Sequence, residues 1–167
     1  NAKFQGPRDI AITSEEGPTL IVTDTDAHIL RKVVVETGAV TQLAGSVNSA
    51  GSADGVGTNA YFNQPLGVIA SSDGNDVYIC DSQNHRVRLL KMETLAVETF
   101  VGFSQGDNDG IGTHANFNIP AGLGISYDSN YLFVCDQQNN RVRIVNVDTR
   151  HVTTLVGQDH GYNEGTG

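Results

Sequence analysis

Most of the ionisable side chains that could do chemistry in this sequence recur at matched places along it. Each acid closes an apolar run, and each arginine stands at the same distance after its acid. The matched acids are Asp24, Asp81 and Asp136, and the matched arginines are Arg31, Arg88 and Arg143. A side chain present in every copy of a repeated unit usually serves that unit, so we expect turn caps or hydrogen bonds between units. His28 and His85 also recur and receive the same structural interpretation.

A binding role is expected of residues that differ between the copies rather than of residues that recur in every copy. Arg8 and Asp9 stand where the later copies have Leu66-Gly67 and Ala121-Gly122, at the start of a predicted strand. An ion pair inside one unit is the alternative reading of these two residues. The full set of predicted binding residues is Arg8, Asp9, His114, His160 and Tyr162.

Two motifs imitate cofactor sites, and we interpret both as loop structure. Gly55-x-Gly57-x-x-Ala60 has the glycine spacing of a dinucleotide fingerprint, but it is not placed between a strand and a helix that would hold a pyrophosphate. The run 107–110 resembles part of a calcium-binding loop. In the register of an EF-hand, however, the first and twelfth loop positions are Gln105 and Asn116 rather than acids. The sequence therefore predicts no cofactor.

The elements that position these residues are short strands in three tandem copies. Phe62-Asn63-Gln64-Pro65 returns as Phe117-Asn118-Ile119-Pro120, and a weaker first copy begins at Phe4. Within each copy, β-branched or alternating runs such as Arg86-Val87-Arg88-Leu89 are bounded by turn residues. Four antiparallel strands in a repeated unit are typical of a β-propeller blade, so the expected fold class is all-β. We expect the first blade at about residues 1–58, the second at 59–113 and the third at 114–167.

The two cysteines occupy equivalent strand positions in neighbouring copies. Packed sheets lie about 10 Å apart, and a disulfide requires Cα atoms within about 7 Å. We therefore expect Cys80 and Cys135 to be two free, buried thiols.

The second copy carries a specific family resemblance. The run from Asp54 to Gly67, followed by Tyr78-Ile79-Cys80-Asp81 and Asn84-His85-Arg86, closely resembles the NHL repeat. The first copy departs from that pattern, since Ala27 and Ile29 replace the asparagine and the first arginine. The resemblance implies propellers of about six blades, with Arg8 and Asp9 facing the mouth of a central channel.

Three blades would leave an apolar face exposed at each end of the stack. Two outcomes relieve this exposure. A second copy closes a six-bladed ring as a homodimer, or the three blades are half of a longer natural chain. We expect the homodimer.

The leading functional hypothesis is a non-enzymatic scaffold that binds another protein through end-face loops. The resemblance also implies an alternative, because some similar propellers are lyases or lactone-type hydrolases with a calcium or zinc ion in the channel. Among the expected channel positions, only Asp9 could be a ligand. With 19 acids, 10 bases and a net charge of −9, nucleic-acid binding is not expected. No apolar run is long enough to span a membrane.

Overall fold

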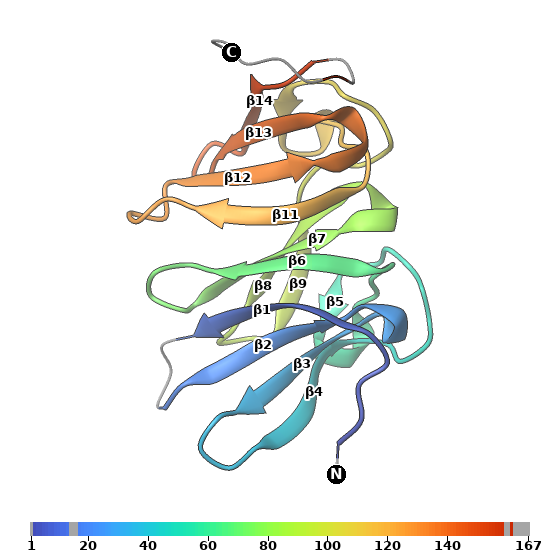
Figure 1. The fold of residues 1–167 in the computed structure, drawn as a ribbon, viewed down its shortest axis with the longest axis vertical. Coiled ribbons are helices and arrows are strands. Elements are labelled where there is room, and N and C mark those ends of the chain that lie inside the picture. Colours follow the sequence, from blue (N-terminus) through green and yellow to red (C-terminus); the bar gives the residue numbers. More distant parts are fainter. Residues whose placement is uncertain (1, 14–16, 159–160, 162–167) are drawn as a thin grey trace.

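The β-branched runs form strands, and the strands form three antiparallel sheets that are stacked side by side (Figure 1). The computed structural model describes residues 2–13, 17–158 and 161. Each sheet follows chain order from an inner strand outward, and the inner strands of neighbouring sheets lie against one another. This is the arrangement of adjacent propeller blades, so the sheets are called blades 1, 2 and 3. In the described part of the chain the stack stays open at both ends.

Each blade has four long strands. Blade 1 consists of β1 (Pro7–Thr13), β2 (Thr19–Asp24), β3 (Ile29–Val34) and β4 (Ala39–Gly45). Blade 2 has β6 (Pro65–Ala70), β7 (Asp76–Asp81), β8 (Arg86–Lys91) and β9 (Ala96–Val101). Blade 3 has β11 (Pro120–Ile125), β12 (Tyr131–Asp136), β13 (Arg141–Asn146) and β14 (His151–Val156). The expected all-β architecture is confirmed at this level, while closure into a ring stays a prediction.

Blades 2 and 3 each gain a short fifth strand from the loop that precedes them. β5 (Gly55–Val56) pairs with the outer edge of β9, and β10 (Gly110–Ile111) pairs with the outer edge of β14. Short 3-10 turns follow at once, η2 (Gly57–Asn59) and η4 (Gly112–His114). Blade 1 has four strands in the described residues, so the outer edge of β4 is unpaired there.

Each second strand ends in an acid that leads into a tight corner. The corners are η1 (Thr25–Ala27), η3 (Ser82–Asn84) and η5 (Gln137–Asn139). A residue with left-handed backbone closes each corner, namely His28, His85 or Asn140, with φ of 60°, 56° and 54°. Histidine and asparagine tolerate this conformation better than most residues, which explains why the corner sequence is similar in all three copies.

The hydrophobic core lies between the blades. Side chains alternate along each strand, so one face of blade 2 packs on blade 1 through Val77 and Ile79, and the other packs on blade 3 through Tyr78 and Cys80. The Tyr78 and Phe100 rings meet edge to face, with centroids 5.1 Å apart. This burial is the main source of stability that joins the blades.

One cysteine prediction is wrong in part. Both thiols are free and Cys80 is buried as expected, but Cys135 is exposed. Cys80 faces blade 3, where its sulfur lies 4.0 Å from the Gly122 carbonyl oxygen. Cys135 has the same orientation on blade 3, and the described chain has no further blade to cover it.

The two ends of the blades differ in what they present. The hairpin end, at the left in Figure 1, consists of the turns 35–38, 71–75, 92–95, 126–130 and 147–150. The corner end, at the right, consists of η1, η3, η5 and the long loops 46–54 and 102–109. These two ends are the candidate surfaces for binding.

Candidate functional site

The repeated acids and arginines hold the preceding loop against its blade. Asp81 accepts hydrogen bonds from the Asn63 backbone N–H (2.7 Å) and the Asn84 side chain (2.8 Å). It also pairs with Arg88 at 2.9 Å, and both side chains are 0% exposed. The other arm of Arg88 reaches Asp54 at 2.7 Å. Burial raises the pKa of Asp81, and the charge of Arg88 opposes that rise.

Blade 3 repeats the same network, while blade 1 has an incomplete copy. Arg143 pairs with Asp136 (2.9 Å) and with Asp109 (2.6 Å). Among the described residues, Arg31 has one carboxylate partner, Asp24, at the longer distance of 3.4 Å. The guanidinium carbons of Arg31, Arg88 and Arg143 lie 5.1–5.4 Å from the centre of a phenylalanine ring in each case. These arginines are thus committed to internal contacts and do not form a basic binding face.

The corner of each blade also hydrogen-bonds to the next blade. The Thr25 hydroxyl donates to the Pro65 carbonyl (2.6 Å), and the Ser82 hydroxyl donates to the Pro120 carbonyl (2.5 Å). His28 Nδ1 accepts from the Gln64 N–H (3.1 Å).

His85 Nδ1 accepts in the same way from the Ile119 N–H (3.2 Å). Burial lowers the pKa of His85, with a further contribution from nearby Arg86, which keeps the ring neutral and able to accept. The recurring histidines therefore have structural contacts in both blades.

Asp9 joins the inner strands of blades 1 and 2. Its Oδ2 accepts from the Val68 N–H at 2.9 Å, and its own N–H donates to the Thr23 hydroxyl at 3.0 Å. Arg8 is exposed beside it. Within the described residues the two side chains form no ion pair, so the intrablade pair considered from the sequence is not formed. The Asp9 carboxylate is largely occupied by backbone donors, while Arg8 remains accessible.

Of the other predicted binding residues, the structure describes His114, which does not lie beside Arg8. His114 is exposed at the end of η4, next to the outermost strand of blade 3, whereas Arg8 lies on the innermost strand of blade 1. Its Nδ1 lies 3.2 Å from the Ile111 carbonyl oxygen. His160 and Tyr162 lie outside the described residues. Among the described members of the predicted set, His114 thus lies apart from Arg8 and Asp9.

The inner turns of blades 2 and 3 form a rigid pair at the hairpin end. In the turn of blade 3, Asp128 accepts from the Ser126 hydroxyl (2.6 Å), the Asn130 N–H (3.1 Å) and the Asn130 amide (2.7 Å). In blade 2, Asp73 is bonded in the same pattern by Ser71 and Asn75. These hydrogen bonds lower the pKa of Asp73 and of Asp128, so both carboxylates stay charged.

The two turns are tied together and present one bulky side chain. The Ser129 hydroxyl accepts from the Ser72 N–H at 2.9 Å and bonds to the Ser72 hydroxyl at 3.1 Å. Beside it, Tyr127 is 100% exposed at the tip of the blade 3 turn. The result is a preorganised support with a fully accessible aromatic ring.

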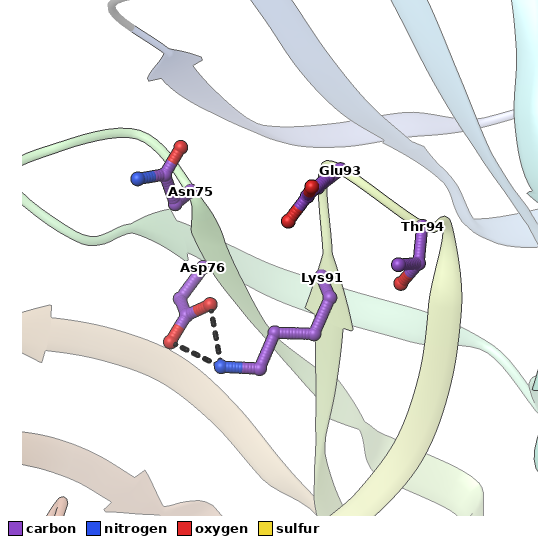
Figure 2. A pocket seen from close by; sticks show the side chains of 5 residues that line it. All are labelled: Asn75, Asp76, Lys91, Glu93 and Thr94. Atoms are coloured by element: carbon purple, nitrogen blue, oxygen red, sulfur yellow. Dashed lines mark hydrogen bonds and ion pairs between the residues drawn. The ribbon is translucent and has the colours of Figure 1, made fainter.

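A pocket lies between the two hairpin turns of blade 2 (Figure 2). It has a volume of about 440 Å³ and is lined by Asn75, Asp76, Lys91, Glu93 and Thr94. Lys91 crosses its floor to pair with Asp76 at 2.8 Å, as the dashed lines in Figure 2 show. Every lining side chain is polar, and ligand pockets for small molecules are predominantly apolar.

Sequence reasoning missed Tyr127 although the signal was available. The blade 3 turn reads Ser126-Tyr127-Asp128-Ser129-Asn130, and the matching blade 2 turn has Ser72 at the tyrosine position. Tyr127 therefore breaks the repeat, which is the criterion that selected Arg8 and Asp9.

Within the described ranges, no group of three or more histidine, cysteine, aspartate or glutamate side chains is placed to hold a metal ion. The expectation of no cofactor stays a prediction, and the channel calcium or zinc ion stays its untested alternative. No helix among the described elements has the length and apolarity needed to cross a membrane.

Comparison with known proteins agrees with this architecture. The human protein named NHL repeat-containing protein 2 is 31% identical over 165 residues, covering 92% of this chain and 22% of that protein. The protein SUPPRESSOR OF QUENCHING 1, chloroplastic, of Arabidopsis thaliana is 32% identical over 156 residues, with 87% and 14% covered. The crystal structure of an auxiliary nutrient binding protein from Bacteroides ovatus superposes with a TM-score of 0.67 at 25% identity, covering 81% of this chain and 35% of that one.

The blades and their repeated contacts define a β-propeller repeat protein. A family model described as NHL repeat matches residues 62–88, the centre of blade 2. The chain belongs to the NHL-repeat family, which confirms the resemblance inferred from the sequence. It spans about a fifth of the length of the human relative, 22%.

Proposed function

We propose that this chain is a protein-binding scaffold whose contact surface is the hairpin end of blades 2 and 3. The observation that supports this most directly is Tyr127, fully exposed on a turn that is bonded internally and to its neighbour. Tyrosine is a frequent anchor of protein interfaces because it offers a large contact area with few rotatable bonds. A turn that is already ordered loses little entropy on binding.

The charge around Tyr127 defines the partner's chemistry. The hairpin-end turns of blades 2 and 3 carry four acids, Asp73, Glu93, Asp128 and Asp148. The nearby bases Lys91 and Arg150 are paired with Asp76 and Glu98. A complementary partner presents lysine or arginine around an apolar or aromatic contact.

The same proposal includes assembly as a half-propeller dimer. Ile10 and Ile12 are exposed on the outer face of blade 1, and Leu155 and Val156 on the outer face of blade 3. Soluble proteins rarely leave such faces uncovered. A twofold dimer covers both faces in both copies, because blade 3 of each chain packs on blade 1 of the other.

The binding surface is tested by quantitative pull-down with immobilised protein, comparing Tyr127→Ala with Val47→Ala. Val47 is a partly exposed residue of the corner end and serves as the matched control. Truncating an interface anchor typically costs about 2 kcal/mol or more, so we expect a loss of about thirtyfold in affinity for the captured partner. Retention of every partner by the tyrosine variant would refute the surface. If affinity for the partner is lost only in an Arg8→Ala variant, the contact lies instead at the channel mouth.

A further inference from the structure

The pocket between the two hairpin turns of blade 2 has a charged floor. Asp76 and Lys91 stand directly opposite each other on β7 and β8, and they form an ion pair at 2.8 Å. The same cross-strand position holds an uncharged pair in the other blades, Tyr131 with Asn146 and Thr19 with Val34. The floor therefore differs between the copies, as a binding residue is expected to do.

The floor lies on the side of blade 2 that faces blade 3. The adjacent residues Val77 and Leu90 belong to the core between blades 1 and 2. Side chains alternate along a strand, so Asp76 and Lys91 project from the opposite face. The turn that carries Tyr127 lies on that side, because it belongs to blade 3 and is hydrogen-bonded to the inner turn of blade 2. The pocket and Tyr127 therefore belong to one surface.

The acids of these turns act on a common region. Tyr78 projects toward blade 3 from the same face of β7 as the pocket floor. Burial raises the pKa of Tyr78 to about 12. Nearby acids raise this pKa further and Arg150 opposes them; the acids are Asp76, Asp73 and Asp148. The turns of blades 2 and 3 thus add negative potential at the same place, which favours a cation there.

The equivalent outer turn of blade 3 is tied together by a residue that blade 2 lacks. Asn146 stands there in place of Lys91, and its Oδ1 accepts from the Thr149 N–H and hydroxyl, both at 2.8 Å. In blade 2 the lysine reaches across to Asp76 instead, so Thr94 has no such partner within the described chain. The space that remains between the turns has a volume of about 440 Å³, which is in the range of ligand sites.

The nitrogen donors that line the pocket are already engaged. The Lys91 ammonium donates to both oxygens of Asp76, at 2.8 and 2.9 Å. The Asn75 amide nitrogen donates to Asp73 Oδ2 at 2.9 Å. Both nitrogen-bearing side chains are therefore bound to a carboxylate before any ligand enters, which disfavours an anion as the ligand.

The acceptors, in contrast, are in excess. Within the described residues the Glu93 carboxylate has no hydrogen-bonded or ionic partner, and Figure 2 shows it pointing from the outer turn toward the inner turn. The carbonyl oxygen of the Asn75 side chain accepts no hydrogen bond there either. The Thr94 hydroxyl accepts from the Ala96 N–H at 3.3 Å and keeps a second lone pair. Two acids against one base give the lining a formal charge of −1.

This excess of acceptors is complementary to a cation that carries many donors. A guanidinium has five N–H donors in one plane, whereas an ammonium has three around one point. We propose that the pocket receives the arginine side chain of a protein partner, with its guanidinium between Glu93 on the outer turn and Asn75 on the inner turn. The inference rests on the protein-binding surface proposed above and identifies a partner residue that this surface recognises in addition to its contact with Tyr127.

The first test is a titration of the isotope-labelled full chain with Nα-acetyl-arginine amide, followed by amide chemical shifts. We expect saturable shifts at Asn75, Glu93 and Thr94. Nα-acetyl-citrulline amide has nearly the same shape without the charge, so it should bind more weakly by about fivefold or more. An arginine titration in which these three amides do not shift overturns the inference.

Two substitutions change the charge of the pocket in opposite directions. Glu93→Gln removes the free carboxylate, so the dissociation constant for Nα-acetyl-arginine amide should rise about fivefold. Lys91→Met releases the Asp76 carboxylate from its pair, so the same constant should fall by a similar factor. Glu36→Gln is the matched control and should change nothing, because Glu36 occupies the same turn position in blade 1.

The direction of the Lys91→Met effect separates a cation site from an anion site. If the pocket binds an anion through Lys91, the wild type binds Nα-acetyl-glutamate amide in preference to the arginine probe. Lys91→Met then weakens that binding instead of strengthening the binding of arginine. This result overturns the inference.

Quantitative pull-down with the same variants separates this inference from the proposal on which it rests. Capture of the partner should weaken with Glu93→Gln and strengthen with Lys91→Met, and Nα-acetyl-arginine amide should compete with it. If Tyr127→Ala abolishes capture while Glu93→Gln leaves it unchanged, the inference is overturned and the binding surface stands. If both variants capture the partner as the wild type does, both proposals are overturned.

Discussion

Replacing Asp81 by asparagine is expected to lower the free energy of unfolding by about 3 kcal/mol. Asp81 and Arg88 are both 0% exposed and lie 2.9 Å apart, so the substitution leaves a buried cation without its closest partner. Breaking a buried ion pair by removing one member costs about 3–5 kcal/mol. The low end applies here, because Arg88 keeps Asp54 and the new side chain retains one acceptor oxygen.

Asp54→Asn is the matched control on the same arginine. Asp54 also contacts Arg88, at 2.7 Å, but its side chain is 54% exposed. Ion pairs with an exposed member contribute about 0–1 kcal/mol, so a cost of 1 kcal/mol or less is expected. Urea unfolding monitored by circular dichroism measures both variants, at one fixed protein concentration.

The decisive quantity is the difference between the losses in free energy of unfolding caused by Asp81→Asn and by Asp54→Asn. If Asp54→Asn destabilises the fold as much as Asp81→Asn, burial does not determine the strength of these pairs. A loss below about 1 kcal/mol for Asp81→Asn would equally refute the structural role assigned to the repeated acid.

Three further outcomes follow from particular contacts. Gly67→Ala should lower the free energy of unfolding by about 1–3 kcal/mol and Tm by about 4 °C, because the new Cβ would meet the backbone oxygen of Ala121 at 2.5 Å. At Gly124 the nearest atom to a new Cβ is at 3.8 Å, so Gly124→Ala should leave Tm unchanged in calorimetry. Burial lowers the pKa of His85, so the unfolded chain binds a proton at this histidine first as the pH falls. The free energy of unfolding should therefore be fully retained above about pH 6.5 and decline below it. His85→Asn should flatten that slope in denaturant titrations at several pH values. Alkylation followed by mass spectrometry should label the exposed Cys135, while Cys80 stays unlabelled because burial raises its pKa and blocks access.

The strands and their grouping into three blades could be predicted because the same short-range residue patterns recur in each copy. Arg86-Val87-Arg88-Leu89 alternates as a strand does, and turn residues bound each run. The fifth strands could not be predicted in this way. β5 and β10 are two residues long, and their pairing depends on where the loop meets the outer strand, which no local pattern records.

Exposed faces at the ends of the stack were expected from the sequence, but the prediction for Cys135 did not take them into account. Cys80 and Cys135 are equivalent in sequence, yet one is covered by a neighbouring blade and the other is not. Equivalence in a repeat fixes the direction of a side chain, whereas its exposure depends on which blades are present. Asp9 illustrates the same limit, since its bond to Val68 arises from a contact between two blades.

The fifth strands have a consequence for biosynthesis. In blades 2 and 3 the outer strand pairs with a segment that lies before its own blade in the chain, as β9 does with β5 and β14 does with β10. During translation, therefore, the ribosome has released the closing segment of blade 2 well before the strand that it closes. Blade 2 can complete its hydrogen bonding as soon as β9 emerges, without waiting for blade 3. Because the closing strands of blades 2 and 3 are synthesised before the outer strands they pair with, those outer edges are exposed only briefly, which limits the time available for pairing with other chains.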